Sequence, residues 1–440
     1  MFRAFCVLAL AAAAAAAVEH APVAYTSGER QVVGKLQDEE VTGVCDDGVK
    51  SLSGYFKIEG SKNAHYFFYF FEARNGAADA PTAVWLTGGP GCSSQLALFT
   101  ENGPCSITED ASQTQKRPQS WNTNQNIMWV DQPTGVGFSY GDSDDYSSNE
   151  AEVADDMYAF LNAFMKAHPE YNNHGTVMFG ESYGGHYVPA ISSRIVDGMK
   201  SDDANLVKLV GMGVGNGLTK PEVQYAYYPA MAVNNTYGIK TVSDDVAAAM
   251  EAAVPRCIDL IKKCQDNTQS CAFAQSYCNL KLVEPYSKTG KNVYDITKPC
   301  KGDLCYDFSY VDTFLNKDEI KTALHVADEA SEWKSCNMKV NTDFKLDWMK
   351  NFDGAVAKVL AEEIPVLIYA GDLDYICNWM GNKAWTLEFE WEGKEAFNAA
   401  MDEPWVVDET VHGMLRTAGN LQFLQVYKAG HMTPMDQPEA

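Results

Sequence analysis

Short runs of apolar residues recur along the chain, and each run is followed by glycine or by a turn. They occupy 83–86, 127–130, 177–179, 209–214, 365–370 and 421–427, a length that suits buried strands. Between them lie segments with helical spacing of apolar positions, such as 150–168 and 187–199. Buried strands that alternate with helices predict an α/β protein with a mostly parallel central sheet and helices on both faces.

Two regions depart from this alternation. Residues 54–58 and 64–71 are rich in aromatic side chains and predict an antiparallel hairpin that leads into the sheet. From about 218 to 348 the strand–helix pattern fades, and most of the cysteines lie here. We therefore expect a core in two parts, 22–217 and 349–440, with a disulfide-stapled cap inserted over 218–348.

The amino terminus and the cysteine count indicate the secretory pathway. Residues 1–21 combine a basic start, an apolar stretch and small residues, as a signal peptide does. Of the 12 cysteines, Cys6 would leave with this segment, and the odd number that remains predicts disulfides with at least one free thiol. A sequon at Asn234 is a candidate glycosylation site. No later segment is apolar for long enough to predict a membrane span.

The net negative charge argues against anionic partners. The chain has 440 residues and a formal net charge of -25 at pH 7. So much negative charge repels nucleic acid and anionic membranes, and we expect neither as a partner.

Candidate chemistry begins at residues 180–184, which read Gly-Glu-Ser-Tyr-Gly between a strand-length run and a helical pattern. Strand, Gly-x-Ser-x-Gly and helix form the context of a nucleophile elbow, in which Ser182 is raised above the sheet edge. The glycines are needed because a Cβ beside the sharp turn would clash with the neighbouring strand and helix. The motif alone is weak, so other residues must support it.

A serine nucleophile needs a histidine base and an acid that orients the base, in the chain order Ser, Asp or Glu, His for this fold. Asp372 and Asp374 directly follow the run 365–370, and either could be the acid. His431 follows the last strand-length run, whereas His412 precedes it, so His431 is the expected base.

The loop after residues 83–86 is rich in glycine and could supply the second amide of an oxyanion hole, beside that of Tyr183. It lacks the Gly-Lys-Ser/Thr ending of a phosphate-binding loop. The predicted chemistry therefore requires neither a metal nor an organic cofactor.

With these residues in place, the sequence from about Ser53 onward resembles the serine carboxypeptidases. The motifs that carry the resemblance occur in the order of that family: WLTGGPGCSS, ENGP, SWN, VDQPTGVGFSY, GESYGGHYVP, GNG, YAGDLDYICNWMGNKAW and AGHMTPMDQPE. The resemblance implies an α/β-hydrolase fold. It also implies a triad of Ser182, Asp374 and His431, and an oxyanion hole at the amides of Gly89 and Tyr183.

The resemblance further implies how substrate is bound. Glu181 and Glu101, with residue 87, would recognise the free carboxylate of a peptide, and at least one Glu must then be protonated. Met432 would line the pocket of the leaving amino acid, and Trp348, Ile376, Cys377 and Tyr183 the adjacent acyl-side pocket. These walls are apolar, so a preference for apolar side chains is expected.

Two features depart from the family pattern. Thr87 stands where hydrolases of the family usually carry Asn, and its single hydroxyl cannot offer the same amide donors. Related acyltransferases also vary at this loop, so an acyltransferase is the first alternative function, but they tend to replace the residue that matches Glu181. The sequence also ends at Ala440, where the family usually continues into a closing helix.

The family pattern also sorts the cysteines and leaves Cys377 as a free thiol. The implied pairs are Cys92–Cys336, Cys257–Cys278, Cys264–Cys271 and Cys300–Cys305, and the remaining Cys45 and Cys105 are expected to pair. The sequence thus predicts a serine-type carboxypeptidase that acts on peptides and proteins with a free C-terminus, favours acidic pH, and resides in a vacuole or lysosome or outside the cell. A non-catalytic protective partner is the second alternative, and a homodimer is one option for its assembly.

Overall fold

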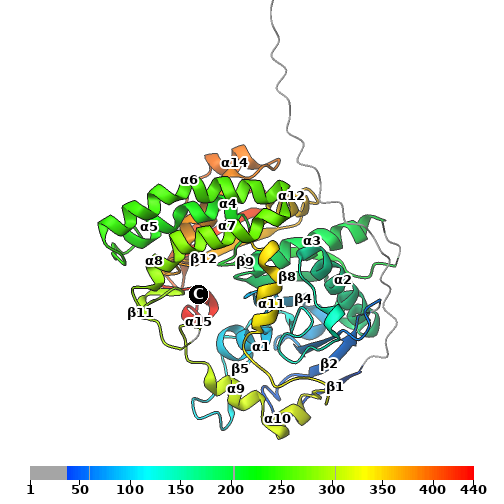
Figure 1. The fold of residues 1–440 in the computed structure, drawn as a ribbon. Helices are drawn as coiled ribbons and strands as arrows, with labels where there is room; N and C mark the ends of the chain where they lie inside the picture. The colour runs from blue at the N-terminus through cyan, green and yellow to red at the C-terminus, as the bar shows by residue number, and fades with distance from the viewer. Residues whose placement is uncertain (1–36, 59, 202–203, 303) are drawn as a thin grey trace, which may run out of the picture.

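A computed structural model describes residues 37–440 apart from 59, 202–203 and 303. The expected signal peptide at 1–21 lies outside the described residues. One sheet of 11 strands runs through the molecule, and helices lie on both of its faces (Figure 1).

The middle of the sheet is parallel and its two ends are antiparallel. Helices and strands alternate through this parallel part, so the α/β-hydrolase fold predicted from the sequence is confirmed. The predicted hairpin is also present, as β2 paired with β3. The strand order across the sheet is β1 (Gln37–Glu40), β2 (Ser51–Lys57), β3 (His65–Phe71), β7 (Asn126–Val130), β4 (Thr82–Leu86), β8 (Thr176–Glu181), β9 (Leu209–Gly215), β12 (Val366–Gly371), β15 (Leu421–Val426), β14 (Thr410–Ala418) and β13 (Glu403–Val407).

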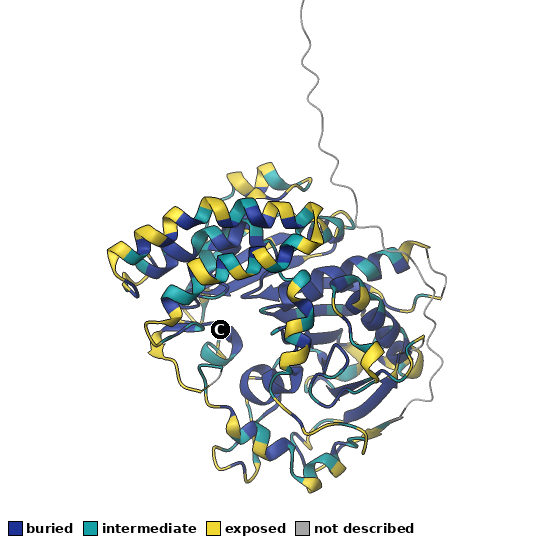
Figure 2. Ribbon diagram, viewed as in Figure 1, coloured by how far each residue is buried: buried dark blue, intermediate teal, exposed yellow. Residues whose placement is uncertain are grey.

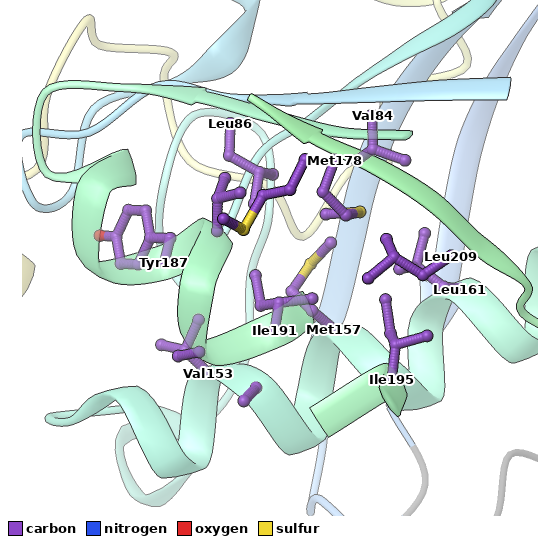
Figure 3. Close-up of a cluster of buried hydrophobic side chains, with 14 of the residues drawn as sticks. Val84, Leu86, Val153, Met157, Leu161, Met178, Tyr187, Ile191, Ile195 and Leu209 are labelled. Atoms are coloured by element: carbon purple, nitrogen blue, oxygen red, sulfur yellow. The ribbon is translucent and has the colours of Figure 1, made fainter. Parts of the chain in front are cut away.

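The larger apolar core lies on one face of the sheet. Side chains of β4, β8 and β9, among them Val84, Met178 and Leu209, meet Met157 and Ile191 of the covering helices (Figure 3). All five are fully or almost fully buried. This packing fixes the helix that follows the candidate nucleophile. The helices of this face are α2 (Glu150–Ala167), α3 (Gly184–Ser201), α12 (Asp353–Leu360), α13 (Trp379–Glu388) and α14 (Lys394–Ala399).

The opposite face is covered mainly by short elements. Trp85 and Trp129 of the sheet pack there with Phe314 and Trp333. Near the carboxyl end of the chain, side chains of β12 and β15 line a groove of about 530 Å³ that Ala440 also borders. The covering elements are α1 (Ser94–Ala97), the π-helical turn η2 (Leu98–Asn102), the hairpin β5 (Cys105–Ile107) and β6 (Thr114–Lys116), α9 (Ser309–Leu315) and α10 (Asp318–Ala323).

The expected cap does not pack as a single body. Its first part forms a separate apolar cluster over the sheet edge, and its helices keep exposed outer faces (Figure 2). Residues 308–333 instead join the core of the opposite sheet face through α9, whereas Val340 and Phe344, near the end of the cap, join the larger core. The cap elements are α4 (Pro221–Gln224), α5 (Tyr228–Val233), α6 (Asp244–Asp266), α7 (Cys271–Cys278), α8 (Glu284–Ser287), β10 (Lys291–Asn292), β11 (Asp295–Pro299) and α11 (Met338–Asp343).

In the described part of the chain, five disulfides join the cysteines in the pairs that were expected, and Cys377 is free and buried. Two nested pairs staple α6 to α7 within the separate apolar cluster of the cap. Cys92–Cys336 ties the glycine-rich loop after β4 to the end of the cap. Among the described residues, no helix combines the length and the apolar character needed to cross a bilayer.

Candidate active site

Ser182 occupies a strained turn between β8 and α3. Its φ of 63° lies in the left-handed region, which non-glycine residues rarely adopt. A Cβ on Gly180 would lie 2.6 Å from a methyl group of Val188, and one on Gly184 would lie 3.0 Å from the carbonyl oxygen of Leu86. Both flanking positions therefore require glycine, as a nucleophile elbow does.

Asp374 and His431 form a hydrogen-bonded pair just beyond the carboxyl ends of the neighbouring strands β12 and β15. The imidazole Nδ1 of His431 lies 2.7 Å from Oδ2 of Asp374, and both residues are buried. The amides of Ile376 and Cys377 donate to the same carboxylate over 3.0 and 3.2 Å, so the acid is held in one orientation. Asp372 points elsewhere and accepts the hydroxyl of Tyr237 over 2.9 Å. The structure thus joins His431 to Asp374 rather than to Asp372.

Asn216 is a further residue of this network, and the sequence interpretation gave it no role. Its Nδ2 donates to Oδ2 of Asp374 over 2.9 Å, and its Oδ1 accepts from the amide of Gly371 and the hydroxyl of Thr433. It links the acid, the end of β12 and the loop after His431. The signal was a Gly-Asn-Gly sequence at the end of a strand-length run, where the Asn has a φ of 41°.

The glycine-rich loop lies directly against the elbow. A Cβ on Gly88 would lie 2.2 Å from the amide nitrogen of Tyr183 and 2.8 Å from the Cβ of Ser182. Gly89 has a φ of 109°, which a residue with a side chain would rarely adopt. The loop backbone at Gly88 therefore lies directly against Ser182 and Tyr183.

Glu181 and Glu101 form a buried carboxyl pair beside the nucleophile, called the first acid pair below. Each residue is 2% exposed, and in the described part of the chain neither oxygen of Glu101 has a hydrogen-bond partner, so the two side chains act on each other through charge. Burial raises the pKa of Glu101 to about 7. Burial and the negative charge of Glu101 raise the pKa of Glu181 well above its ordinary value. At acidic pH the pair is therefore protonated and can donate hydrogen bonds.

The turn η2 holds Glu101, and Arg117 anchors this turn. The guanidinium of Arg117 donates to the carbonyl oxygens of Leu98 and Gly103 over 3.1 and 2.7 Å, and to that of Phe99 over 2.9 Å. These bonds satisfy carbonyls at the end of a short helical turn. The position of Glu101 is thus fixed by the fold and does not depend on substrate.

Thr87 is buried in the loop after β4, and its hydroxyl is already engaged. The Thr87 Oγ1 accepts a hydrogen bond from the indole Nε1 of Trp85 over 3.0 Å. Its amide donates to the hydroxyl of Ser94 over 3.1 Å. One hydroxyl hydrogen remains for a substrate, where an amide side chain would offer two N–H groups.

The expected pocket residues lie around the triad and the elbow. The rings of Trp348 and Tyr183 are 5.4 Å apart between centroids. Cys377 contributes a thiol to a cluster with Asp374 and His431 in which one ligand atom of each residue lies within 4.8 Å of the others. Burial raises the pKa of this thiol, so it is held as the neutral SH group rather than the thiolate that binds metals. Met432 is also buried, directly after His431.

The fold and this site together define an α/β-hydrolase with a serine, histidine and aspartate arrangement. The family model described as serine carboxypeptidase matches residues 43–440. The chain belongs to the serine carboxypeptidase family, and it is an enzyme of the serine-type carboxypeptidase class.

Individual relatives agree with this assignment. The chain is 43% identical over 430 residues to carboxypeptidase Y homolog A of Pyrenophora tritici-repentis, and the aligned part covers 94% of this chain and 77% of the relative. It is 43% identical to carboxypeptidase Y of Candida albicans over 89% of this chain and 72% of the relative. The crystal structure of the prohormone-processing carboxypeptidase Kex1 from Saccharomyces cerevisiae superposes with a TM-score of 0.80 at 25% identity, covering 93% of each chain.

Proposed function

We propose that this carboxypeptidase removes C-terminal residues from peptides and proteins through an acyl-enzyme formed on Ser182. The observation that carries the proposal is the hydrogen-bonded pair of His431 and Asp374 next to a strained serine turn. His431 takes the hydroxyl proton as Ser182 attacks the last peptide carbonyl, and then gives this proton to the leaving amino acid. Water, activated by the same imidazole, hydrolyses the ester.

Asp374 and the oxyanion loop support the charges that develop in this reaction. The carboxylate of Asp374 stabilises the imidazolium and keeps the ring oriented, and three donors hold this carboxylate in place. The amides of Gly89 and Tyr183 bind the tetrahedral oxyanion, an interaction typically worth ~3–4 kcal/mol per donor in the transition state.

The first acid pair restricts cleavage to a free C-terminus. A protonated Glu181 or Glu101 donates a hydrogen bond to the terminal carboxylate, whereas two ionised side chains would repel it. Because burial raises the pKa of Glu101 to about 7, the pair loses one proton as pH rises through neutrality. The KM for free-acid peptides should therefore rise as pH increases through neutrality.

The side chain that precedes the scissile bond lies against Trp348, Tyr183, Ile376 and Cys377. Trp348 and Ile376 are half-buried, so they can be covered by substrate. The side chain of the leaving residue lies against Met432. Apolar walls favour apolar side chains at both places.

One substrate pair tests this function. Purified protein is incubated from pH 4 to 8 with an N-blocked dipeptide and with its C-terminal amide. Release of the terminal amino acid from the free acid, strongest at acidic pH and absent in Ser182→Ala, is expected. No release at any pH, with Ser182 still labelled by a fluorophosphonate, would contradict peptide hydrolysis.

That contradictory result would favour the acyltransferase, because Thr87 offers fewer donors to a carboxylate than Asn would. Turnover of an acyl ester with an alcohol acceptor would then be the assay to run. A Ser182→Ala protein that kept the whole biological effect would instead support the non-catalytic role.

The five disulfides place the protein in the secretory pathway. Within it, a vacuole, a lysosome or the extracellular space is the proposed destination, and Asn234 is the proposed glycan site. Asn234 lies exposed at the end of α5, as a glycan requires. A mass shift lost in Asn234→Gln would test the glycan, and the elution volume of the pure protein would test the homodimer.

A further inference from the structure

A second pair of buried carboxyl groups lies on the other side of the elbow, and the proposed reaction does not use it. Glu150 begins α2 and is 2% exposed, and Asp347 lies at the end of the cap and is 7% exposed. The negative charge of Asp347 acts on Glu150 across the space between them. We call Glu150 and Asp347 the second acid pair.

This pair is connected to the residue that follows the nucleophile. The hydroxyl of Tyr183 donates to Oδ2 of Asp347 over 3.0 Å, and the amide of Glu150 hydrogen-bonds the same carboxylate. Asp347 is also the direct neighbour of Trp348, whose ring packs on that of Tyr183. The backbone of residue 183 supplies the oxyanion amide in the proposed reaction. Asp347 is therefore bonded to the side chain of an oxyanion-hole residue, and it is joined to the pocket wall at Trp348 through the chain.

The Glu150 carboxyl itself lacks hydrogen bonds. In the described part of the chain neither of its oxygens has a hydrogen-bond partner, and both are inaccessible to water. An ionised carboxylate in such a place is very unfavourable, so Glu150 is held neutral. Burial first, and then the charge of Asp347, raises its pKa well above the ordinary value. Burial also raises the pKa of Asp347 to about 7.

The groups around the second acid pair come from three neighbouring segments. Tyr183 and Tyr187 face it from the elbow and α3, and burial and nearby negative charge keep their hydroxyls neutral. Lys350 lowers and Glu152 raises the pKa of Asp347 from a greater distance. Burial keeps the His186 imidazole neutral, because its pKa is lowered to about 4. Lys350 is the cation among these groups of the described chain, and its single charge cannot balance two buried carboxylates.

We propose that Glu150 and Asp347 are positioning residues of the active site, which hold Tyr183 and the Trp348 wall while at least one of the two carboxyls is protonated. Double ionisation would place two unbalanced charges in the core and drive Asp347 and Trp348 apart from Tyr183. This inference deepens the proposed function and rests on its assignment of Trp348 to the acyl-side pocket.

Two substrates that differ only before the scissile bond test the positioning role. N-blocked dipeptides with Phe or with Gly at that position, and with the same terminal residue, are compared at pH 5. In Glu150→Ala we expect kcat/KM for the Phe substrate to fall ~10-fold, mainly through KM, and less than ~2-fold for the Gly substrate. Glu150→Gln, the neutral isostere, should restore most of the loss. Glu152→Gln, two residues along the same helix but exposed, should match the wild type.

The protonation requirement is tested with an N-blocked Phe ester, which has no free carboxylate and does not report on the first acid pair. Its KM should rise as pH increases from 5 to 9 in the wild type and stay flat in Glu150→Gln. An equal loss for Phe and Gly substrates, together with a lower Tm, would show a merely structural role and overturn the proposal.

Fluorescence keeps the test independent of turnover. The difference signal between the wild type and Trp348→Phe is followed from pH 5 to 9. A transition present in the wild type and in Glu152→Gln, but absent in Glu150→Gln and Asp347→Asn, would support the second acid pair even if no peptide were hydrolysed. A featureless wild-type signal would contradict it, whereas missing hydrolysis alone would count only against the proposed function.

Discussion

The residues before and after Ser182 are each associated with a pair of buried carboxyl groups, but the two associations differ. Glu181, before the nucleophile, is itself a member of the first acid pair and lies with Glu101 near the hydrogen-bonded His431 and Asp374. Tyr183, after the nucleophile, donates its hydroxyl to the second acid pair through Asp347. One pair can therefore touch substrate directly, while the other reaches substrate only through a neighbouring side chain.

This difference shows how similar chemistry can serve two purposes around one serine. In the first pair a proton is available for a ligand, so its loss should affect binding of the terminal carboxylate. In the second pair the acceptor is already bonded to the protein, and Glu150 has no access to water. Its ionisation should therefore change the shape of the site and the stability of the fold.

Removal of the nucleophile should have the largest effect on activity, and it leaves substrate binding by the first acid pair to be measured alone. Ser182→Ala should lower kcat by ~10⁶-fold, since removal of a triad serine removes the covalent route. The variant should still bind a product peptide, more tightly at pH 5 than at pH 8, because the first acid pair is intact. Calorimetry checks this. Binding that did not change with pH would remove the first pair from carboxylate recognition.

Truncation of a side chain of the first acid pair should have the second largest effect on activity. Glu181→Ala should raise KM for a free-acid dipeptide by ~10–100-fold, as expected for the loss of a charge-assisted hydrogen bond of ~1.5–3 kcal/mol. Hydrolysis of an N-blocked ester should be much less affected. Steady-state kinetics on both substrates check the split. Glu152→Gln serves as an exposed control, and equal losses on acid and ester would mean that Glu181 positions Ser182 rather than substrate.

Much of this arrangement could be predicted because it is local in sequence. The apolar runs and their flanking glycines predicted the parallel sheet and the elbow at Ser182. The residues alone did not decide whether Asp372 or Asp374 is the acid of the triad, since both follow the same strand. The choice depends on which carboxylate contacts His431, in the loop after another strand. Only the family resemblance made that choice before the structure did.

Contacts between distant segments could not be predicted in this way. Tyr183 and Asp347 are 164 positions apart, and Asn216 and Asp374 are 158 apart. Glu150 looks like an ordinary acidic residue in the first turn of an exposed helix, a position that the helix dipole favours. Its burial follows from the packing of the cap end against α2 and α3, and no periodicity in the sequence records that packing.

The pH dependence of the free energy of unfolding should distinguish the second acid pair from the first, with a smaller effect than the changes in activity. The folded-state pKa of Glu150 is raised above its unfolded value, so its stabilising effect is complete below pH ~4.5 and is lost as pH rises through the folded pKa. Glu150→Gln cannot ionise, and we expect it to be ~1–3 kcal/mol more stable than the wild type at pH 8, with little difference at pH 4.5. Urea unfolding at both pH values checks this. A variant less stable than the wild type at pH 8 would mean that the ionised carboxylate is balanced.

Replacement of Thr87 by Asn, which introduces a side-chain amide, should have the smallest effect on activity. In Thr87→Asn the side-chain oxygen can still accept from the Trp85 indole, as the Thr87 hydroxyl does over 3.0 Å, and the new N–H groups can reach the substrate carboxylate. One additional neutral hydrogen bond is worth ~1 kcal/mol, so KM for a free-acid dipeptide should fall ~3–5-fold. The KM for the matching ester should not change. Because the donor comes from an amide that does not titrate, the gain should persist at pH 8, where Glu101 has lost its proton. A gain confined to acidic pH would instead mean that residue 87 acts by adjusting the protonation of Glu181 and Glu101.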